Sequence, residues 1–506
     1  MTFISLVYGL FLLIVLATYW LGRSPQWRLW TLLIVSLIFY SSLQLQYIPL
    51  LLVITLITFR LGQAMEANTA LGGLQAKDQN LSNQEWQQGQ EKWNGRRLRL
   101  LWFGIFINVI LLFGFKYIPF FLTAIAAPLN LPVAQNTAVW ISDRLIGPLG
   151  LSFFTFECIA YLIDVYRGAP ASQQLLKFAS YKLFFPKLIA GPITRYHPFA
   201  IQFKGLKFPT LEQSTEGLWL IACGAIKKAL LADRLAIFVD LCFGNLERAG
   251  SADLWLAIAA YGLQLYLDFS GYVDIARGSA ILLGFNLPHN FNFPYFSISI
   301  ADFWRRWHIT LGDWIRNYLY FPLGGNRKGL ARTCWNLLMV MLIAGIWHGA
   351  AWGFVVWGGY HGLALAIHRL TEALSKRFER MKNWWQSLPG VLLAWLLTQL
   401  MVFSSWIFFR LPNLQDSGLV LQRLWGHTAD VQFAQKVYQE ALGLQRFEVA
   451  VLLAIVIAIM GIIYAFYQGL KIQLNWPLKL LLVPICLYMV WVFVPPGSLP
   501  YIYFDF

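Results

Sequence analysis

A histidine stands in the middle of "GIWHGAAWG", residues 345–353, within an apolar stretch of the chain. Gly345, Gly349 and Gly353 recur every four residues, so on one continuous helix they would form a smooth stripe that lets another helix approach closely. His348 lies beside that stripe and would point toward packed protein rather than lipid. An ionisable side chain at such a place indicates a functional site. The alternative, equally supported by spacing alone, is a neutral histidine that hydrogen-bonds a neighbouring helix.

A second histidine lies in an unusual segment, "ADFWRRWHITLGDWIRNYLYFPLGGNRKG" (301–329), where aromatic residues alternate with arginines at helical spacing. This pattern predicts an amphipathic helix at the inner membrane interface. His308 and His348 together could supply one buried site. His361 would lie about 140° away from His348 on a continuous helix, so the two need not share a site. The other histidines are interpreted as loop or span-end residues: His197, His289, His368 and His427.

The elements that position these residues are predicted from composition. Hydrophobic residues make up 58% of the 506 residues and charged residues only 12%, which indicates a helical membrane protein. We expect an all-α bundle of about eleven transmembrane helices, with re-entrant and interfacial pieces, as a single polytopic domain over 1–506. Besides the histidine segments, the predicted spans lie near 4–21, 28–44, 47–61, 100–123, 146–165, 216–243, 254–284, 388–410, 449–468 and 476–495.

The formal net charge of +15 is interpreted as a topology signal, because basic residues near spans usually mark the cytoplasmic side. The polar segment 62–99 closes with three arginines, so we expect a cytoplasmic loop there, the N-terminus outside and an extracytoplasmic loop at 411–447. No basic residue precedes Arg23, so Met1–Leu21 reads as a retained span. The proline-rich segment 182–199 predicts non-helical backbone, re-entrant or interfacial, that is buried in protein.

Several classes of function have little support. The five cysteines are scattered and lack any C-x-x-C pair, so neither a disulfide framework nor a metal site is indicated. Gly324 and Gly329 have the spacing of a P-loop, but Leu330 follows where that motif needs lysine. There is no G-x-S-x-G or H-E-x-x-H motif, no nucleic-acid signature, and no internal repeat of the kind found in inverted-repeat transporters.

Several ordered motifs carry a family resemblance, and the two histidine segments lead them. Others are "GLSFFTFECIAYLIDVYRG" (150–168), "FFPKLIAGPITRY" (184–196), "YGLQLYLDFSGYVDIARGSAILLGFNLPHNFNFPY" (261–295), "WIFFRLP" (406–412) and the aromatic "YIYFDF". Together they resemble the membrane-bound O-acyltransferase (MBOAT) family, strongly over about 100–410. The closest likeness is to the bacterial branch that acetylates alginate or D-alanylates teichoic acid, and the long C-terminal part favours the acetylation group.

The resemblance implies that His348 is the catalytic histidine and that His308 is the second motif histidine of the bacterial branch. Asn317 departs from the pattern, because relatives commonly have aspartate there. We expect His348 to remove the acceptor hydroxyl proton and later protonate the thiolate, with His308 orienting the donor or the base. The candidates for oxyanion donation or for lining a donor tunnel are Trp304, Arg305, Arg316, Asn317, Asn336, Trp347 and Trp352. For the arginines, contact with lipid headgroups is an equally supported alternative. Asp268 is expected to pair with a basic neighbour.

These expectations describe a multi-pass protein of the bacterial plasma membrane. It would move an acetyl group from a cytoplasmic thioester, acetyl-CoA or an acyl-carrier protein, across the membrane. The acceptor would be an exported polysaccharide, reached directly or through an extracytoplasmic acetyltransferase-like partner. No bound cofactor is expected. The alternatives are D-alanyl transfer to a cell-wall polymer, or a non-enzymatic transporter or scaffold of a polysaccharide export complex.

Overall fold

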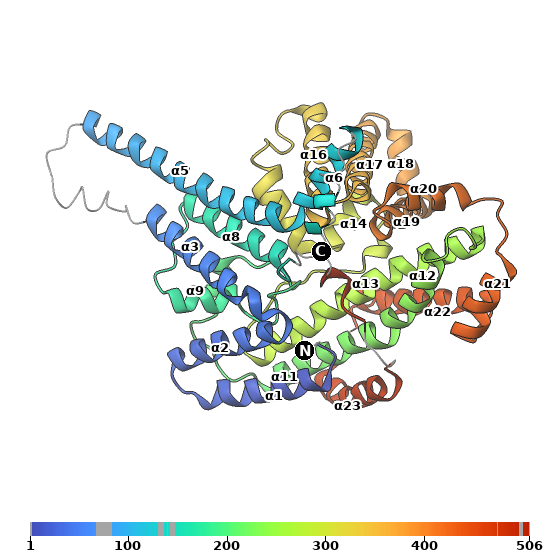
Figure 1. Ribbon diagram of the computed structural model, residues 1–506, viewed down its shortest axis with the longest axis horizontal. Coiled ribbons are helices and arrows are strands. Elements are labelled where there is room, and N and C mark those ends of the chain that lie inside the picture. The colour runs from blue at the N-terminus through green and yellow to red at the C-terminus, as the bar shows by residue number, and fades with distance from the viewer. Residues whose placement is uncertain are drawn as a thin grey trace. The chain divides into compact units, whose positions relative to one another are not determined.

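The computed structural model describes residues 3–66, 83–129, 136–138, 140–141, 147–472, 474–494 and 499–504. Within these residues every regular element is a helix. The all-α prediction is therefore confirmed. Contacts between backbone positions group the chain into two compact units, Met1–Thr210 with Ser279–Leu287, and Leu211–Gly278 with Pro288–Phe504. Figure 1 shows the helices of both units. The prediction of a single membrane domain stays a prediction.

The first unit contains the helices drawn in blue to teal in Figure 1. They are α1 (Leu6–Leu21), α2 (Pro25–Gln44), α3 (Ile48–Glu66), α5 (Asn83–Lys116), α6 (Ile118–Leu129), α8 (Leu151–Tyr166), α9 (Leu175–Lys182) and α10 (Tyr196–Ile201). Helix α8 is buried along almost its whole length, and its contacts include α3 and α5. The predicted polar loop 62–99 is shorter than expected. Its first residues extend α3, its last residues belong to α5, and 67–82 lie outside the described residues.

A buried ion cluster fixes the proline-rich segment in the first unit. Backbone 183–194 is irregular and buried, as predicted, whereas the end of the predicted segment 182–199 belongs to helix α10. Glu157 on α8 accepts hydrogen bonds from Lys187 at 2.6 Å, from Lys182 at 3.3 Å, and from the Thr194 amide at 3.0 Å. Because buried charges are stable only when paired and hydrogen-bonded, these contacts explain how non-helical backbone persists inside the protein.

The second unit contains α11 (Leu211–Ala225), η2 (Ile226–Ala232), α12 (Asp233–Phe243), α13 (Ser251–Leu282), α14 (Ile300–Arg306), α15 (Ile309–Ile315), η4 (Arg316–Tyr320), α16 (Gly329–His348), α17 (Trp352–Arg377), α18 (Glu379–Gln386), α19 (Leu388–Arg410), α20 (Leu414–Arg423), α21 (Val431–Ala434), η5 (Gln435–Leu442), α22 (Arg446–Tyr464), η6 (Ala465–Gly469), α23 (Trp476–Phe493) and η7 (Ile502–Phe504). The last residues of α13 are grouped with the first unit.

The predicted outer loop 411–447 is largely helical, since it forms α20, α21 and η5. It also packs on the second unit, where Tyr438 and Arg446 both donate to Asp253 at 2.6 Å. Its sidedness stays a prediction, as does that of 62–99.

Six helical segments among the described residues are long and apolar enough to cross a membrane: Pro25–Glu66, Asn94–Lys116, Gly329–His348, Leu388–Arg410, Arg446–Gly469 and Trp476–Phe493. Other predicted crossings fall on shorter helices such as α1, or on helices such as α8 and α13 that carry buried charged residues. Helices α8 and α13 lie largely in the protein interior, where a charged side chain finds a partner that lipid cannot supply.

Candidate active site

His348 is the last residue of α16, so Gly345, Gly349 and Gly353 do not lie on one continuous helix. Gly349 has extended backbone (φ −166°, ψ 157°) and α17 begins at Trp352. The close approach predicted at the glycines is present in a different form. A Cβ on Gly345 would lie 2.2 Å from the Phe354 carbonyl oxygen of α17 and 3.0 Å from the Gly358 Cα. The glycines therefore let α16 and α17 pack as a tight antiparallel pair with His348 at the turn.

His308 also lies at a helix break, and the single amphipathic helix predicted over 301–329 is wrong. Helix α14 ends at Arg306 and α15 begins at Ile309, while His308 has left-handed backbone with φ of 44°. Loop residue Asn290 holds the break together. Its Oδ1 accepts from the Thr310 amide at 3.1 Å and lies 3.2 Å from His308 Nδ1. An amide N–H only donates, so Oδ1 is an acceptor and His308 Nδ1 carries the proton.

The two histidines, 40 residues apart in sequence, meet at one aromatic ring. Tyr503 lies with its ring centroid 6.0 Å from His308 and 6.0 Å from His348. Phe269 of α13 stacks on Tyr503, with ring centroids 3.8 Å apart, and its centroid lies 4.9 Å from that of His308. His308 is fully buried and His348 is 2% exposed. A substrate that reaches both imidazoles must therefore enter the protein interior next to Tyr503.

The segment that carries Tyr503 is held by buried charges. Lys228 of η2 lies 2.7 Å from Asp268 and 2.8 Å from Asp233. Lys228 also donates to the Pro500 carbonyl at 3.0 Å, and the Ile502 amide donates to Asp268 at 2.9 Å. Asp268 thus pairs with a basic residue, as predicted. The Asp268 carboxylate and the Lys228 ammonium therefore hold helices η2 and α13 together with the segment that carries Tyr503.

Aromatic side chains surround His348 on its other sides. The nearest ring centroids are those of Trp347 at 4.8 Å, Trp357 at 5.1 Å and Phe409 at 5.1 Å. These rings exclude water from the imidazole, and electrostatic interactions are stronger in such a place than in water. Burial also lowers the pKa of His308 from its ordinary value of 6.5 to about 3, so this imidazole is neutral at physiological pH.

His361 lies next to this site, and its hydrogen bonds indicate a structural role. Its ring lies 4.7 Å from that of Trp357, which also contacts His348. Trp304 Nε1 donates to His361 Nδ1 at 3.3 Å, so Nε2 carries the proton and donates to Ser405 Oγ at 2.9 Å. With both nitrogens engaged, His361 ties α14, α17 and α19 together.

Of the other predicted site residues, Trp347 alone has described ring contacts with both histidines, with its centroid 6.4 Å from that of His308. Trp304 contacts His361 and Trp357 instead. Arg305 and Arg316 are surface residues with side chains 71% and 52% exposed, and they pair with Asp302 and Asp313 of their own helices. Their place favours the headgroup-contact alternative for these two arginines.

The remaining candidates have other roles in the fold. Asn317 Nδ2 donates to the Asp313 carbonyl within its own helical segment. Asn336 is buried and donates to the Gly325 carbonyl at 2.9 Å, which fixes the turn before α16. Trp352 is 53% exposed at the start of α17. Oxyanion donation by Asn317, Asn336 or Trp352 stays a prediction.

Sequence reasoning missed three residues that build the site: Tyr503, Asn290 and Lys228. The aromatic "YIYFDF" was a signal of family likeness, but nothing in its spacing places it against a histidine more than 150 residues earlier. Asn290 lay in a loop after a proline, and Lys228 lay within a predicted span. Long-range packing alone reveals their contacts.

Two buried imidazoles, His308 and His348, thus lie at helix breaks close to one aromatic ring inside a helical membrane protein. The MBOAT (membrane-bound O-acyltransferase) family model matches residues 34–408, about three quarters of the chain. The chain therefore belongs to the membrane-bound O-acyltransferase family. Both histidines lie within the matched region, whereas the aromatic segment and α22 lie beyond it.

Individual relatives agree with this assignment. The chain is 37% identical over 410 residues to the probable alginate O-acetylase AlgI of Pseudomonas syringae pv. tomato, an alignment that covers 81% of this chain and 72% of that protein. It is 34% identical to the peptidoglycan O-acetyltransferase of Helicobacter pylori, over 80% and 75% of the two chains. The teichoic acid D-alanyltransferase of Bacillus subtilis is more distant, at 26% identity over 58% and 76%.

Proposed function

We propose that this protein is an O-acetyltransferase of the bacterial plasma membrane that acetylates an exported polysaccharide. The observation that carries this proposal is the meeting of His308 and His348 at Tyr503 in a buried, aromatic site of a family member. The names of two relatives, an alginate O-acetylase and a peptidoglycan O-acetyltransferase, support acetyl as the group and a polysaccharide as the acceptor class. The D-alanyltransferase likeness is weaker, so D-alanyl transfer is the second choice.

In the proposed reaction, the carbon–sulfur bond of an acetyl thioester breaks and a carbon–oxygen bond to the acceptor hydroxyl forms. His348 takes the hydroxyl proton as oxygen attacks the carbonyl carbon, and it returns that proton to the departing thiolate sulfur. A base placed in this way contributes roughly 10²–10⁴-fold to the rate. The proton moves from the hydroxyl oxygen to the sulfur, and one bond forms as one breaks. The reaction therefore needs no further reactant.

His308 is proposed as a positioning or donor-orienting residue. Asn290 fixes its tautomer with the proton on Nδ1, so Nε2 is the nitrogen able to accept a hydrogen bond. The left-handed backbone at His308 costs roughly 1–3 kcal/mol for a residue other than glycine, and the structure retains it at this site. Such strain is commonly stored where the direction of a side chain matters for function.

The donor is proposed to be acetyl-CoA or an acyl-carrier thioester that approaches from the cytoplasm. The product leaves on the other side of the membrane, either on the polysaccharide or on an extracytoplasmic acetyltransferase-like partner. The basis is topological: the family is membrane-bound, thioesters are made in the cytoplasm, and exported polymers lie outside.

The test uses purified protein in liposomes that enclose a polysaccharide acceptor, with labelled thioester added outside. Acetyl and D-alanyl thioesters are compared, each with wild type and with His348→Ala as the background. We expect wild-type label on the enclosed polymer with the acetyl donor only. Transfer of D-alanine at a higher rate than acetyl would replace the proposed group. Equal label with wild type and His348→Ala for both donors would remove the proposed chemistry.

A further inference from the structure

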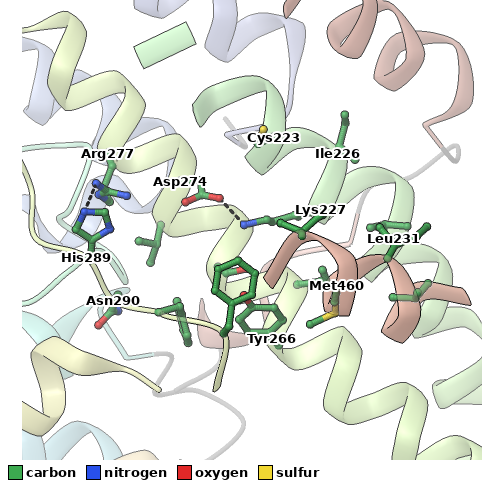
Figure 2. Close-up of a pocket in the computed structure, with 18 residues that line it drawn as sticks. Cys223, Ile226, Lys227, Leu231, Tyr266, Asp274, Arg277, His289, Asn290 and Met460 are labelled. Atoms are coloured by element: carbon green, nitrogen blue, oxygen red, sulfur yellow. Dashed lines mark hydrogen bonds and ion pairs between the residues drawn. The ribbon is translucent and has the colours of Figure 1, made fainter. Parts of the chain in front are cut away.

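A cavity of about 410 Å³ lies in the second unit, separate from the contacts between the histidines and Tyr503 (Figure 2). Helices η2, α13 and α22 and the loop before α14 line it. Cavities that hold small ligands have volumes of roughly 300–1,000 Å³. This cavity is therefore large enough for part of an amphiphile.

One wall of the cavity is formed by a helix that faces lipid. Val456, Ile459, Met460 and Ile463 of α22 line it. The segment Arg446–Gly469 that contains them is long and apolar enough to cross a membrane. Only 11% of its apolar 18-residue stretch is buried. A ligand can therefore reach this wall from the hydrocarbon part of the bilayer, and a hydrocarbon chain is what such a wall would bind.

The opposite part of the lining is polar and cationic. Lys227 pairs with Asp274 at 2.6 Å, and Arg277 Nη2 donates to His289 Nε2 at 3.1 Å. Figure 2 shows both pairs as dashed lines, Lys227 to Asp274 and Arg277 to His289. Two cationic side chains and one carboxylate leave one net positive charge in the lining. Burial and the neighbouring Arg277 keep the pKa of His289 below its ordinary value, so this imidazole accepts rather than adding charge.

We propose that this cavity binds one anionic phospholipid, with an acyl chain against α22 and the phosphate at Arg277 and Lys227. The apolar wall fits the chain, and the net positive lining fits the phosphate. A guanidinium has five N–H donors and can hold His289 and a phosphate oxygen together. Basic pockets between membrane helices are known to bind anionic lipid headgroups.

The proposal goes beyond acetyl transfer, because this cavity includes residues of α22, outside the region matched by the family. It nevertheless borders the active site. Asn290 lines the cavity and also lies 3.2 Å from His308. A lipid in the cavity would therefore rest against the residue that fixes the His308 tautomer.

The first experiment fills the apolar end of the cavity. Met460→Trp is compared with Ile457→Trp, which adds the same side chain to the same helix at a position 44% exposed. Each protein is purified in detergent, and native mass spectrometry counts retained phosphatidylglycerol. We expect one retained lipid per chain in wild type and Ile457→Trp, and at least a tenfold lower occupancy in Met460→Trp. Equal occupancy in all three would overturn the proposal.

The second experiment tests the headgroup. Wild type, Arg277→Gln and the control Arg248→Gln, which removes an exposed cation paired with Asp430, are delipidated. They are then offered phosphatidylglycerol, phosphatidylcholine or palmitate. We expect wild type and the control to prefer phosphatidylglycerol at least tenfold, and Arg277→Gln to lose that preference. A wild-type preference for palmitate or phosphatidylcholine would refute the anionic phospholipid. Because the readout is lipid binding, failure here is distinguishable from failure of the proposed acetyl transfer.

Discussion

Two buried polar regions of this protein differ in how their ionisable groups are satisfied. In the first unit Glu157 accepts from Lys182, Lys187 and Thr194, so each charge has close partners. In the second unit His308 and His348 face aromatic rings rather than opposite charges. The first arrangement stabilises irregular backbone. The second leaves two imidazoles in a dry environment, where we propose that His348 exchanges a proton with the substrate.

The comparison teaches that burial of an ionisable group does not by itself indicate catalysis. Saturated hydrogen bonding, as at Glu157 and at His361, is what a structural role requires. A strained backbone, as at His308, is instead commonly found at functional sites. Five predictions follow from this distinction, and each can contradict it.

The largest effect is expected at His348. His348→Ala should lower acetyl transfer by roughly 10²–10⁴-fold, about 3–5 kcal/mol in the barrier, while the melting temperature in detergent stays close to that of wild type. Labelled-acetyl assays and melting are measured on the same preparation. His361→Ala is the matched control and should lower melting first. A His348→Ala protein that melts normally and transfers at nearly the wild-type rate would leave His308 as the better candidate base.

Glu157→Ala should have a similar magnitude but act on folding. It leaves two buried ammonium groups, Lys182 and Lys187, without their carboxylate, and breaking a buried pair typically costs about 3–5 kcal/mol. Thermal melting and protein abundance report this loss. Asp313→Ala removes a surface carboxylate and should change stability by less than about 1 kcal/mol. If Glu157→Ala melts like Asp313→Ala, the buried cluster is not structural.

Tyr503→Ala should lower acetyl transfer by about 10- to 100-fold, because misplacing catalytic groups by about 1 Å can cost that much. Its ring centroid lies 6.0 Å from that of each imidazole. Transfer rate is measured with saturating donor, and melting serves as the stability control. Tyr503→Phe keeps the ring, so a loss of the same size in that variant would assign the effect to the hydroxyl. Full activity in Tyr503→Ala would show that the ring does not position the histidines.

Acid should destabilise the second unit through His308. Its folded pKa of about 3 lies below the unfolded value of 6.5, so its contribution is fully present above pH 6.5 and is lost as pH falls toward 3. Melting temperature should therefore fall between pH 7.5 and pH 5. In His308→Gln that fall should be smaller, because glutamine does not titrate. An unchanged fall would mean that other groups cause the acid sensitivity.

The smallest effect is expected at the surface arginines. Arg305→Gln and Arg316→Gln should change acetyl transfer by less than about twofold, because exposed ion pairs contribute little. Rates at low donor concentration are the sensitive measurement. A rise in the Michaelis constant for the thioester in either variant would instead restore these arginines as donor-entrance residues.

Much of the fold was predictable, because composition and hydrophobic runs identify a helical membrane protein. Six segments long and apolar enough to span are present in the described residues. The helix breaks were not predictable from periodicity. Trp307 and His308 continue the amphipathic pattern in sequence, but Asn290 side-chain and backbone hydrogen bonds to residues 308–310 favour a turn. At 349–351, contacts with α17 and Pro412 override the regular glycine spacing.

The sequence by itself determined the helical membrane class, the family likeness and the two histidines, because these depend on local composition and ordered motifs. Only the tertiary structure decided which residues accompany them. Tyr503, Asn290 and Lys228 reach the site through contacts between segments far apart in the chain. It also decided the contacts of Arg305, Arg316, Asn317 and Asn336, whose proposed roles in the site stay predictions. The physical reason is that hydrophobicity and spacing are local properties, whereas hydrogen-bond partners in a dry interior are set by packing.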